Sequence, residues 1–184
     1  MTTTLDTATP IEGVVFVSPA IYEDERGVFV ETYRRDWFPL GREMLQSNRT
    51  DRAAGCIVGL HYHLHQADYW YVVAGRTRVV LHDLRAGSPT EGATTSFDLD
   101  AATHGGVYIP PGVAHGYGAS TDVVLTYLVD AYYNPDDELG LAWDDPEVAA
   151  DWGVDDPLLS ARDRANPVRD ALPLDRRPHF GLRR

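Results

Sequence analysis

The segment Gly59-Leu-His-Tyr-His-Leu-His-Gln-Ala-Asp68 carries the strongest structural signal in this chain. Its histidines, His61, His63 and His65, alternate with other residues. Because successive side chains of a β-strand point to opposite faces, an extended conformation places the three imidazoles on one face. An imidazole is costly to bury without a partner, so the pattern indicates a polar functional site. A polar cluster satisfied by its neighbours is the alternative.

The residues that follow extend this pattern into two motifs. Four residues separate His63 from Asp68, and six more separate Asp68 from Gly75. Further on, Gly106-Val-Tyr-Ile-Pro-Pro-Gly-Val-Ala-His115 supplies another histidine after a Pro-Gly turn. The pair is similar to the two signature motifs of the cupin superfamily. This resemblance implies a jelly-roll β-barrel whose interior collects the polar residues.

The remainder of the chain agrees with an all-β domain. Short runs rich in β-branched and aromatic residues, bounded by Gly, Pro, Asp or Asn, predict strands at 14–17, 28–33, 69–73, 76–84, 106–109 and 123–129. A few short helices are expected, at 36–45 and, with Asp145 as N-cap, at 145–153. A turn is expected at 158–164. We predict one domain over 1–184, with 1–10 and 170–184 as flexible or extended tails.

Composition and charge exclude several classes of function. The 184 residues suit one domain with a good core. A formal net charge of -12 argues against a nucleic-acid partner, which needs clustered Lys and Arg. No apolar run approaches the roughly eighteen residues that span a bilayer, and the first residues do not read as a secretory signal. With Cys56 as the single cysteine, these features predict a cytoplasmic protein with no membrane partner.

A narrower resemblance covers Ile11 to Asp163. The chain resembles dTDP-4-dehydrorhamnose 3,5-epimerases in the motifs Ile11-Glu-Gly-Val, Asp24-Glu-Arg-Gly-Val-Phe-Val-Glu31, Gln46-Ser-Asn48, Gly59-Leu-His-Tyr62, His115-Gly-Tyr117, Tyr132-Tyr-Asn-Pro135, Trp143-Asp-Asp-Pro146 and Leu159-Ser-Ala-Arg-Asp163. The resemblance implies an isomerase of deoxysugar biosynthesis, as in the rhamnose pathway. It would act without a cofactor at C3, C5 or both of a dTDP-linked 4-keto-6-deoxy sugar. Members of this family are usually homodimers that exchange strands near the N-terminus, which implies the same here.

The resemblance also implies roles for individual residues. His61 matches the catalytic base, Asp163 the acid that orients it, and Tyr127 a tyrosine that donates a proton from the opposite face. A further set matches positions that bind the nucleotide sugar: Arg26, Phe29, Glu31, Gln46, Asn48, His115, Tyr132 and Arg162.

Three positions depart from the family pattern. Val58 stands where the family has an arginine that helps hold the diphosphate, and Asp68 where it has a lysine that stabilises the enolate oxygen. His63 stands where it has a glutamine. The family pattern implies no metal. The alternative is a divalent ion (Zn, Fe, Mn or Ni) on His61, His63, Asp68 and His115, acting as Lewis acid in place of the lysine.

Two other functions stay open at this point. One is a metal-dependent enzyme of the cupin superfamily with a different substrate. The other is a family member that has kept the fold and lost the chemistry, since fold alone does not fix function.

Overall fold

The computed structural model describes residues 2–38 and 42–181, which form an almost entirely β architecture. Its strands are β1 (Thr4–Asp6), β2 (Val15–Ser18), β3 (Ile21–Asp24), β4 (Gly27–Val30), β5 (Gln46–Arg52), β6 (Ile57–Tyr62), β7 (Asp68–Ala74), β8 (Arg76–Asp83), β9 (Thr94–Asp100), β10 (Gly106–Ile109), β11 (Val113–Ala119), β12 (Val123–Val129) and β13 (Leu139–Gly140). The helical segments are α1 (Ala161–Ala165) and the 3-10 turns η1 (Arg35–Trp37), η2 (Ala101–Thr103), η3 (Pro135–Asp137), η4 (Arg169–Ala171) and η5 (Leu174–Arg176).

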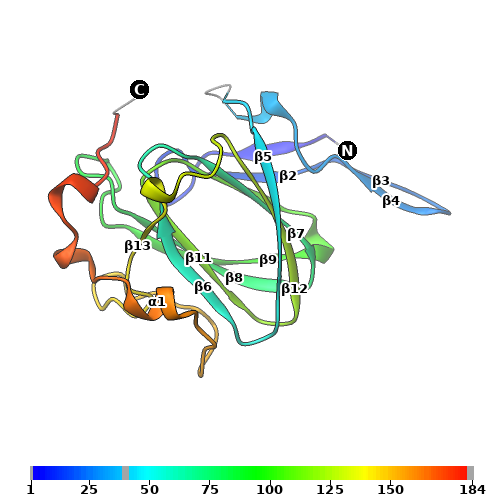
Figure 1. The fold of residues 1–184 in the computed structure, drawn as a ribbon. Helices are drawn as coiled ribbons and strands as arrows, with labels where there is room; N and C mark the ends of the chain where they lie inside the picture. The colour runs from blue at the N-terminus through cyan, green and yellow to red at the C-terminus, as the bar shows by residue number, and fades with distance from the viewer. Residues whose placement is uncertain (1, 39–41, 182–184) are drawn as a thin grey trace.

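Two antiparallel sheets face each other and enclose the core (Figure 1). One has the order β1-β2-β10-β7-β12-β5, and the other the order β13-β6-β11-β8-β9. The predicted all-β, jelly-roll class is confirmed. The predicted strands are all present; β10 and β12 have the predicted bounds, and the others have shifted ends. The expected strand at 28–33, for example, is β4, which ends at Val30.

The space between the sheets holds the main apolar core. Alternating residues of both sheets supply it: Val72, Val79, Leu81, Leu99, Val107, Ile109, Val113, Val123 and Leu125, with Trp70 and Tyr117. The outer face of the five-stranded sheet is also covered. Leu141, Val148, Trp152 and Leu172 pack there against Ile57, Leu60, Val80 and Ala114. Apolar residues are therefore buried on both sides of β11 and on the outer side of β6, which makes these two strands a rigid support for side chains facing inward.

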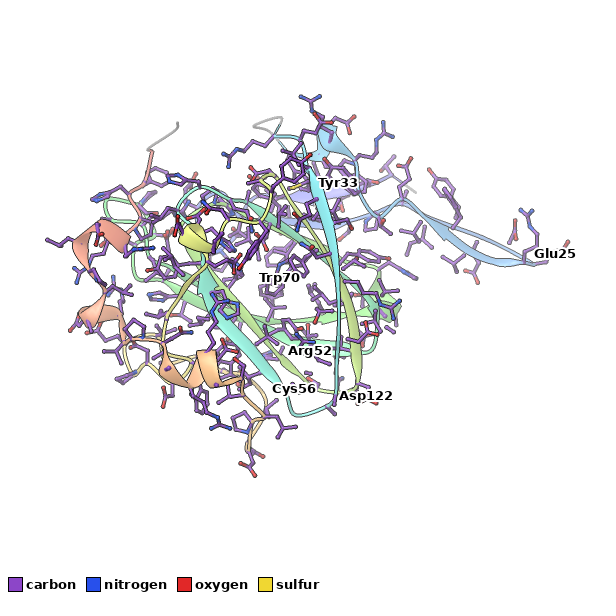
Figure 2. The ribbon with its side chains drawn as sticks, viewed as in Figure 1. Glu25, Tyr33, Arg52, Cys56, Trp70 and Asp122 are labelled. Carbon is purple, nitrogen blue, oxygen red and sulfur yellow. The ribbon has the colours of Figure 1, made fainter. Side chains whose placement is uncertain are left out.

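The β3–β4 hairpin projects away from this body (Figure 1), with Glu25 at its tip (Figure 2). Large apolar side chains on it are exposed: Tyr22, Val28 and Phe29. Exposed apolar groups gathered on one projecting element are typical of a surface that contacts another molecule.

Both expected helices were predicted too long. Asp145 does act as a cap, since its Oδ1 accepts the N–H groups of Glu147 and Val148 at 2.8 and 3.4 Å. The chain makes only one turn, because Ala149 adopts a left-handed conformation with φ of 50°. At 36–45, only η1 forms, and 42–45 is not helical. Positions 39–41 lie outside the described residues.

Near the ends of the chain, the described residues make specific contacts. β1 pairs with β2, and Phe180 lies under the guanidinium of Arg85 at 5.2 Å. The predicted turn at 158–164 contains the start of α1, whose N-cap Ser160 accepts the N–H of Asp163. No helix among the described residues is long and apolar enough to cross a membrane.

Candidate active site

A bulge in β6 places its site residues on the inner face. Val58 pairs with Tyr117 and His61 with His115, so two residues of β6, Gly59 and Leu60, lie opposite Gly116. Without the extra residue, positions 58 and 61 would point to opposite faces. Gly59 has φ of 118°, and a Cβ there would lie 2.7 Å from the Cα of Gly116. The sequence therefore uses glycine at the point where β6 changes phase and presents His61 to the interior.

His61 forms a dyad with Asp163 of α1. Its Nε2 lies 2.7 Å from Oδ1 of Asp163, whose Oδ2 accepts the hydroxyl of Ser160 at 2.9 Å. Burial raises the pKa of Asp163, but the interactions with His61, together with the hydrogen bond from Ser160 and the charge of Arg162, outweigh it and hold this pKa below its usual value. A carboxylate only accepts hydrogen bonds, so Nε2 carries the proton and Nδ1 the lone pair. His61 is thus an oriented base.

Tyr127 approaches from the opposite sheet. On β12 it pairs with Trp70 of β7 and Asn48 of β5, so these three side chains share the inner face. In Figure 2, Trp70 lies between the two sheets. Burial raises the pKa of Tyr127, as do the negative charges of Asp68 and Glu138. Tyr127 is therefore protonated at neutral pH and can donate a proton.

A second polar cluster, His63, Asp68 and His115, lies in the same interior. The exposed fractions of these residues are 5%, 3% and 5%. The Nε2 atoms of His63 and His115 lie 3.9 and 3.8 Å from the two oxygens of Asp68, beyond hydrogen-bonding distance. Each of the three offers one ligand atom within 4.8 Å of the others, so together they could hold a metal ion. Burial lowers the pKa of His115 to about 4.

The dyad and this cluster open on one pocket of about 630 Å³. Its lining is Arg49, Thr50, Asp51, Arg52, Val58, His61, His63, Gln66, Asp68, Trp70, His115, Tyr117, Leu125, Tyr127, Glu138 and Arg162. A volume of this size accommodates a small organic ligand. A base and a proton donor on facing sheets suit proton transfer at carbon.

The structure brings together part of the predicted site. His61, Tyr127, His115 and Arg162 line the pocket, and Asp163 lies behind His61. Four predicted residues lie elsewhere in the same chain. On the hairpin, Arg26 pairs with Asp24 and Phe29 is 66% exposed. Beyond the hairpin, Glu31 pairs with Arg34, and Tyr132 is exposed.

Gln46 and Asn48 are hydrogen-bonded to each other at 2.8 Å and do not line the pocket. The expectation that His65 shares the face of His61 and His63 is wrong. β6 ends at Tyr62, and Asp137 accepts the N–H groups of Leu64 and His65, which turns the chain and leaves His65 exposed.

Sequence reasoning missed Arg52 and Glu138. Arg52 ends β5 next to β12 and donates to the backbone oxygen of Asp51 at 2.9 Å. Among the described residues it forms no close ion pair with a carboxylate, although its charge acts on the neighbouring Asp51, so the guanidinium can still pair with a ligand. Glu138 forms an ion pair with Arg162, with 3.5 Å between the nitrogen and the carboxylate oxygen. No strand was predicted at 46–52, although the alternation Gln46-x-Asn48-x-Thr50-x-Arg52, taken as a strand, could have indicated Arg52.

Comparisons with known proteins agree with this geometry. The family model described as dTDP-4-dehydrorhamnose 3,5-epimerase matches residues 8–170. A dTDP-4-dehydrorhamnose 3-epimerase of Streptomyces niveus is 38% identical over 180 residues, which cover 94% of this chain and 84% of the relative. A dTDP-4-dehydrorhamnose 3,5-epimerase of Neisseria gonorrhoeae is 37% identical over 168 residues. That match covers 88% of this chain but 51% of the relative, so the chain spans about half of the Neisseria protein.

A solved structure from Legionella pneumophila is similar over nearly the whole fold. It is a dTDP-6-deoxy-D-glucose-3,5-epimerase in complex with dTDP-4-keto-L-rhamnose. The TM-score is 0.91 at 28% identity, covering 97% of this chain and 98% of the other.

Proposed function

The chain belongs to the dTDP-4-dehydrorhamnose 3,5-epimerase family, and we propose that it epimerises a dTDP-linked 4-keto-6-deoxy sugar at C3, C5 or both. The observation that carries the proposal is the His61–Asp163 dyad, which faces Tyr127 across one pocket. The reaction is proton transfer alone and belongs to deoxysugar biosynthesis. A cytoplasmic location is part of the proposal and agrees with the single cysteine.

Proton abstraction falls to Nδ1 of His61. It removes the acidic proton next to the C4 ketone, and the electron pair of the broken C–H bond moves onto the ketone oxygen as an enolate. Asp163 stabilises the resulting imidazolium and keeps the ring oriented. Tyr127 then donates its proton to carbon from the other side, because β12 and β6 belong to opposite sheets. The configuration at that carbon is inverted. The imidazolium of His61 then releases its proton to water and the phenolate of Tyr127 takes one up, which restores both groups.

Arginine side chains support binding of the diphosphate. Val58 replaces the arginine expected from the family, but Arg52 and Arg162 line the same pocket. Guanidinium groups pair well with phosphate oxygens. We assign the diphosphate to Arg52 in particular, since in the part of the chain that the structure describes it forms no close ion pair, whereas Arg162 pairs with Glu138.

A homodimer completes the site in this proposal. The β3–β4 hairpin, which carries Arg26 and Phe29, projects away from the two sheets (Figure 1), and neither residue lines the pocket of its own chain. The hairpin of a second copy would bring them to it, in line with the strand exchange expected from the family. The exposed apolar side chains of the hairpin support this pairing.

The test is solvent exchange at the reacting carbons. In deuterium oxide, the wild-type protein should incorporate deuterium at C3, C5 or both of dTDP-4-keto-6-deoxyglucose, followed by NMR. Calorimetry should show binding of dTDP itself. A family member that had lost the chemistry would bind dTDP without exchange. Absence of both at high protein concentration would contradict the proposal.

A further inference from the structure

Two imidazole lone pairs point at one buried carboxylate in the pocket. Nδ1 of His63 donates to the backbone oxygen of Asp137 at 2.7 Å, and Nδ1 of His115 to that of Val113 at 2.9 Å. A carbonyl oxygen only accepts, so in the neutral rings Nε2 carries the lone pair. Neither Nε2 has a hydrogen-bond partner among residues 2–38 and 42–181, and each faces Asp68 at 3.8–3.9 Å.

The orientation of Asp68 is also fixed. Its Oδ1 accepts from Nε2 of Gln66 at 3.0 Å, and its Oδ2 from the indole of Trp70 at 3.1 Å. Both donors are neutral, and no Lys or Arg within the described ranges pairs with this carboxylate. A buried carboxylate beside two lone pairs is unfavourable unless a cation lies between them.

The arrangement resembles that of metal-binding histidines in general. Such histidines usually donate their other ring N–H to a backbone carbonyl or a carboxylate, which fixes ring and tautomer. His63 and His115 both do so. The two motifs are further tied together by the N–H of Gly112, which donates to the backbone oxygen of His63 at 2.7 Å. Around an ion with ligand bonds of about 2.0–2.1 Å in tetrahedral geometry, ligand atoms lie about 3.3 Å apart. The separations of the two Nε2 atoms from the two oxygens of Asp68 are about half an ångström longer, and the three ligand atoms lie within 4.8 Å of one another, so side-chain rotations would bring them onto one ion.

We propose that Nε2 of His63, Nε2 of His115 and the carboxylate of Asp68 bind one divalent transition-metal ion. Two imidazoles and one carboxylate suit Zn²⁺, Fe²⁺, Co²⁺ or Ni²⁺ better than Mg²⁺ or Ca²⁺, which prefer oxygen ligands. With three protein ligands the ion keeps an open position, and all three ligands line the pocket.

His61 is not a ligand in this site. Its Nε2 is engaged by Asp163, and it is absent from the set of ligand atoms that converge. The four-residue set considered from the sequence is therefore reduced to three. This resolves a conflict, because His61 remains free to act as base while the ion is held by its neighbours.

In the family pattern a lysine supplies positive charge at the position of Asp68. A bound ion would supply that charge in this chain. A bound ion would act there as a Lewis acid toward the ketone oxygen, while Nδ1 of His61 takes the proton. This role rests on the proposed function, whereas the binding site does not.

Metal binding is tested on untagged protein after dialysis against a chelator. Calorimetry with Zn²⁺ should give one site per chain, and Co²⁺ should give visible d–d absorption bands typical of histidine ligation. His63→Ala, His115→Ala and the isosteric Asp68→Asn should each weaken binding by more than about a hundredfold. His61→Asn and His65→Ala serve as matched controls and should bind as tightly as wild type. Near-UV circular dichroism checks that each variant is folded.

The outcomes separate the two proposals. Folded wild-type protein that takes up neither ion at micromolar concentration, or uptake that survives all three ligand variants, overturns the metal site. Deuterium exchange is measured on the same samples with and without Zn²⁺. Exchange without metal binding leaves the proposed function intact and refutes the site. Metal binding without deuterium exchange, either with or without Zn²⁺, leaves the site intact and refutes the proposed function. Exchange that rises at least tenfold with Zn²⁺, and only when the ligands are intact, supports both site and role.

Discussion

His61 is the residue on which the proposed chemistry depends most directly. His61→Asn removes the lone pair that takes the proton but keeps a polar side chain of similar size. Deuterium exchange at C3 and C5 should fall by about 10²–10⁴-fold, the usual contribution of a general base. NMR in deuterium oxide measures this rate. His65→Asn is the matched control, since His65 is exposed and outside the pocket, and should exchange at the wild-type rate. Equal loss in both variants would contradict the assignment.

Tyr127 should affect a different step. Tyr127→Phe removes the proton donor and leaves His61 with Asp163 unchanged. We therefore expect deuterium exchange to continue while formation of the epimerised sugar falls by about a hundredfold. Exchange and product are measured by NMR in one sample. A variant in which both rates fall in parallel would assign Tyr127 to binding instead of protonation.

At the scale of elements, the bulge of β6 links strand geometry to the site. Gly59→Ala puts a Cβ 2.8 Å from the backbone oxygen of His115 and forces a side chain into φ of 118°. We expect a loss of about 1–3 kcal/mol in the free energy of unfolding, together with slower deuterium exchange at C3 and C5 of the substrate. Urea denaturation measures the first effect. Gly87→Ala is the control, because its φ is also positive (77°) but no atom lies within 4 Å of the added Cβ. Gly87→Ala should lower the free energy of unfolding by less and leave the rate of deuterium exchange unchanged.

The end of β8 contains a buried network whose stability depends on pH. Asp83 accepts hydrogen bonds from Arg85, Ser88 and Thr90. Burial raises the pKa of Asp83, but these donors outweigh it and leave the pKa below its usual value. A depressed folded-state pKa adds stability above the unfolded value near 3.8, and that stability is lost as pH falls through the folded value.

Asp83→Asn should therefore destabilise the protein by about 3–5 kcal/mol at pH 7, since it leaves Arg85 buried without its partner. The difference from wild type should shrink below about pH 4. Urea denaturation across pH 3–8 measures both. Asp98→Asn removes an exposed partner of Arg78 and should change little. A difference for Asp83→Asn that is constant over this pH range would contradict the assignment.

The features that could be predicted from the sequence are those set by local patterns of residues. Alternation and turn residues identified strands such as β10 and β12 to the residue, because side-chain period and glycine or proline conformation act within a few residues. The same logic failed for His65, since Asp137, far along the chain, turns the backbone after His63. It failed again at Asp145, where packing of Val148 and Trp152 against the five-stranded sheet replaces a longer helix. Arg52 was missed because its role depends on which strand lies beside β5.

At the scale of the whole molecule, the proposed homodimer requires two chains to share one site. Arg26 and Phe29 on the hairpin are separated from His61 within one chain, although the family pattern assigns them to one substrate. Phe29→Asp places a charge on the exposed apolar surface of the hairpin and should shift the protein from dimer to monomer. Sedimentation velocity measures this shift, and Tyr132→Asp, at an exposed position outside the hairpin, should stay dimeric. A monomeric wild-type protein would contradict the proposed exchange of hairpins between two subunits.

Mixing two inactive variants tests the shared site directly. In the exchanged dimer, each site combines His61 of one chain with Arg26 of the other. His61→Asn and Arg26→Ala homodimers therefore each lack a component in both sites. After subunits exchange at random, half of the dimers are mixed, and each mixed dimer has one site with both residues intact. Epimerase activity should recover to about a quarter of the wild-type value per chain. If Arg26 serves its own chain instead, every site keeps a defect and no activity returns, which makes recovery itself the evidence that the hairpin crosses between subunits.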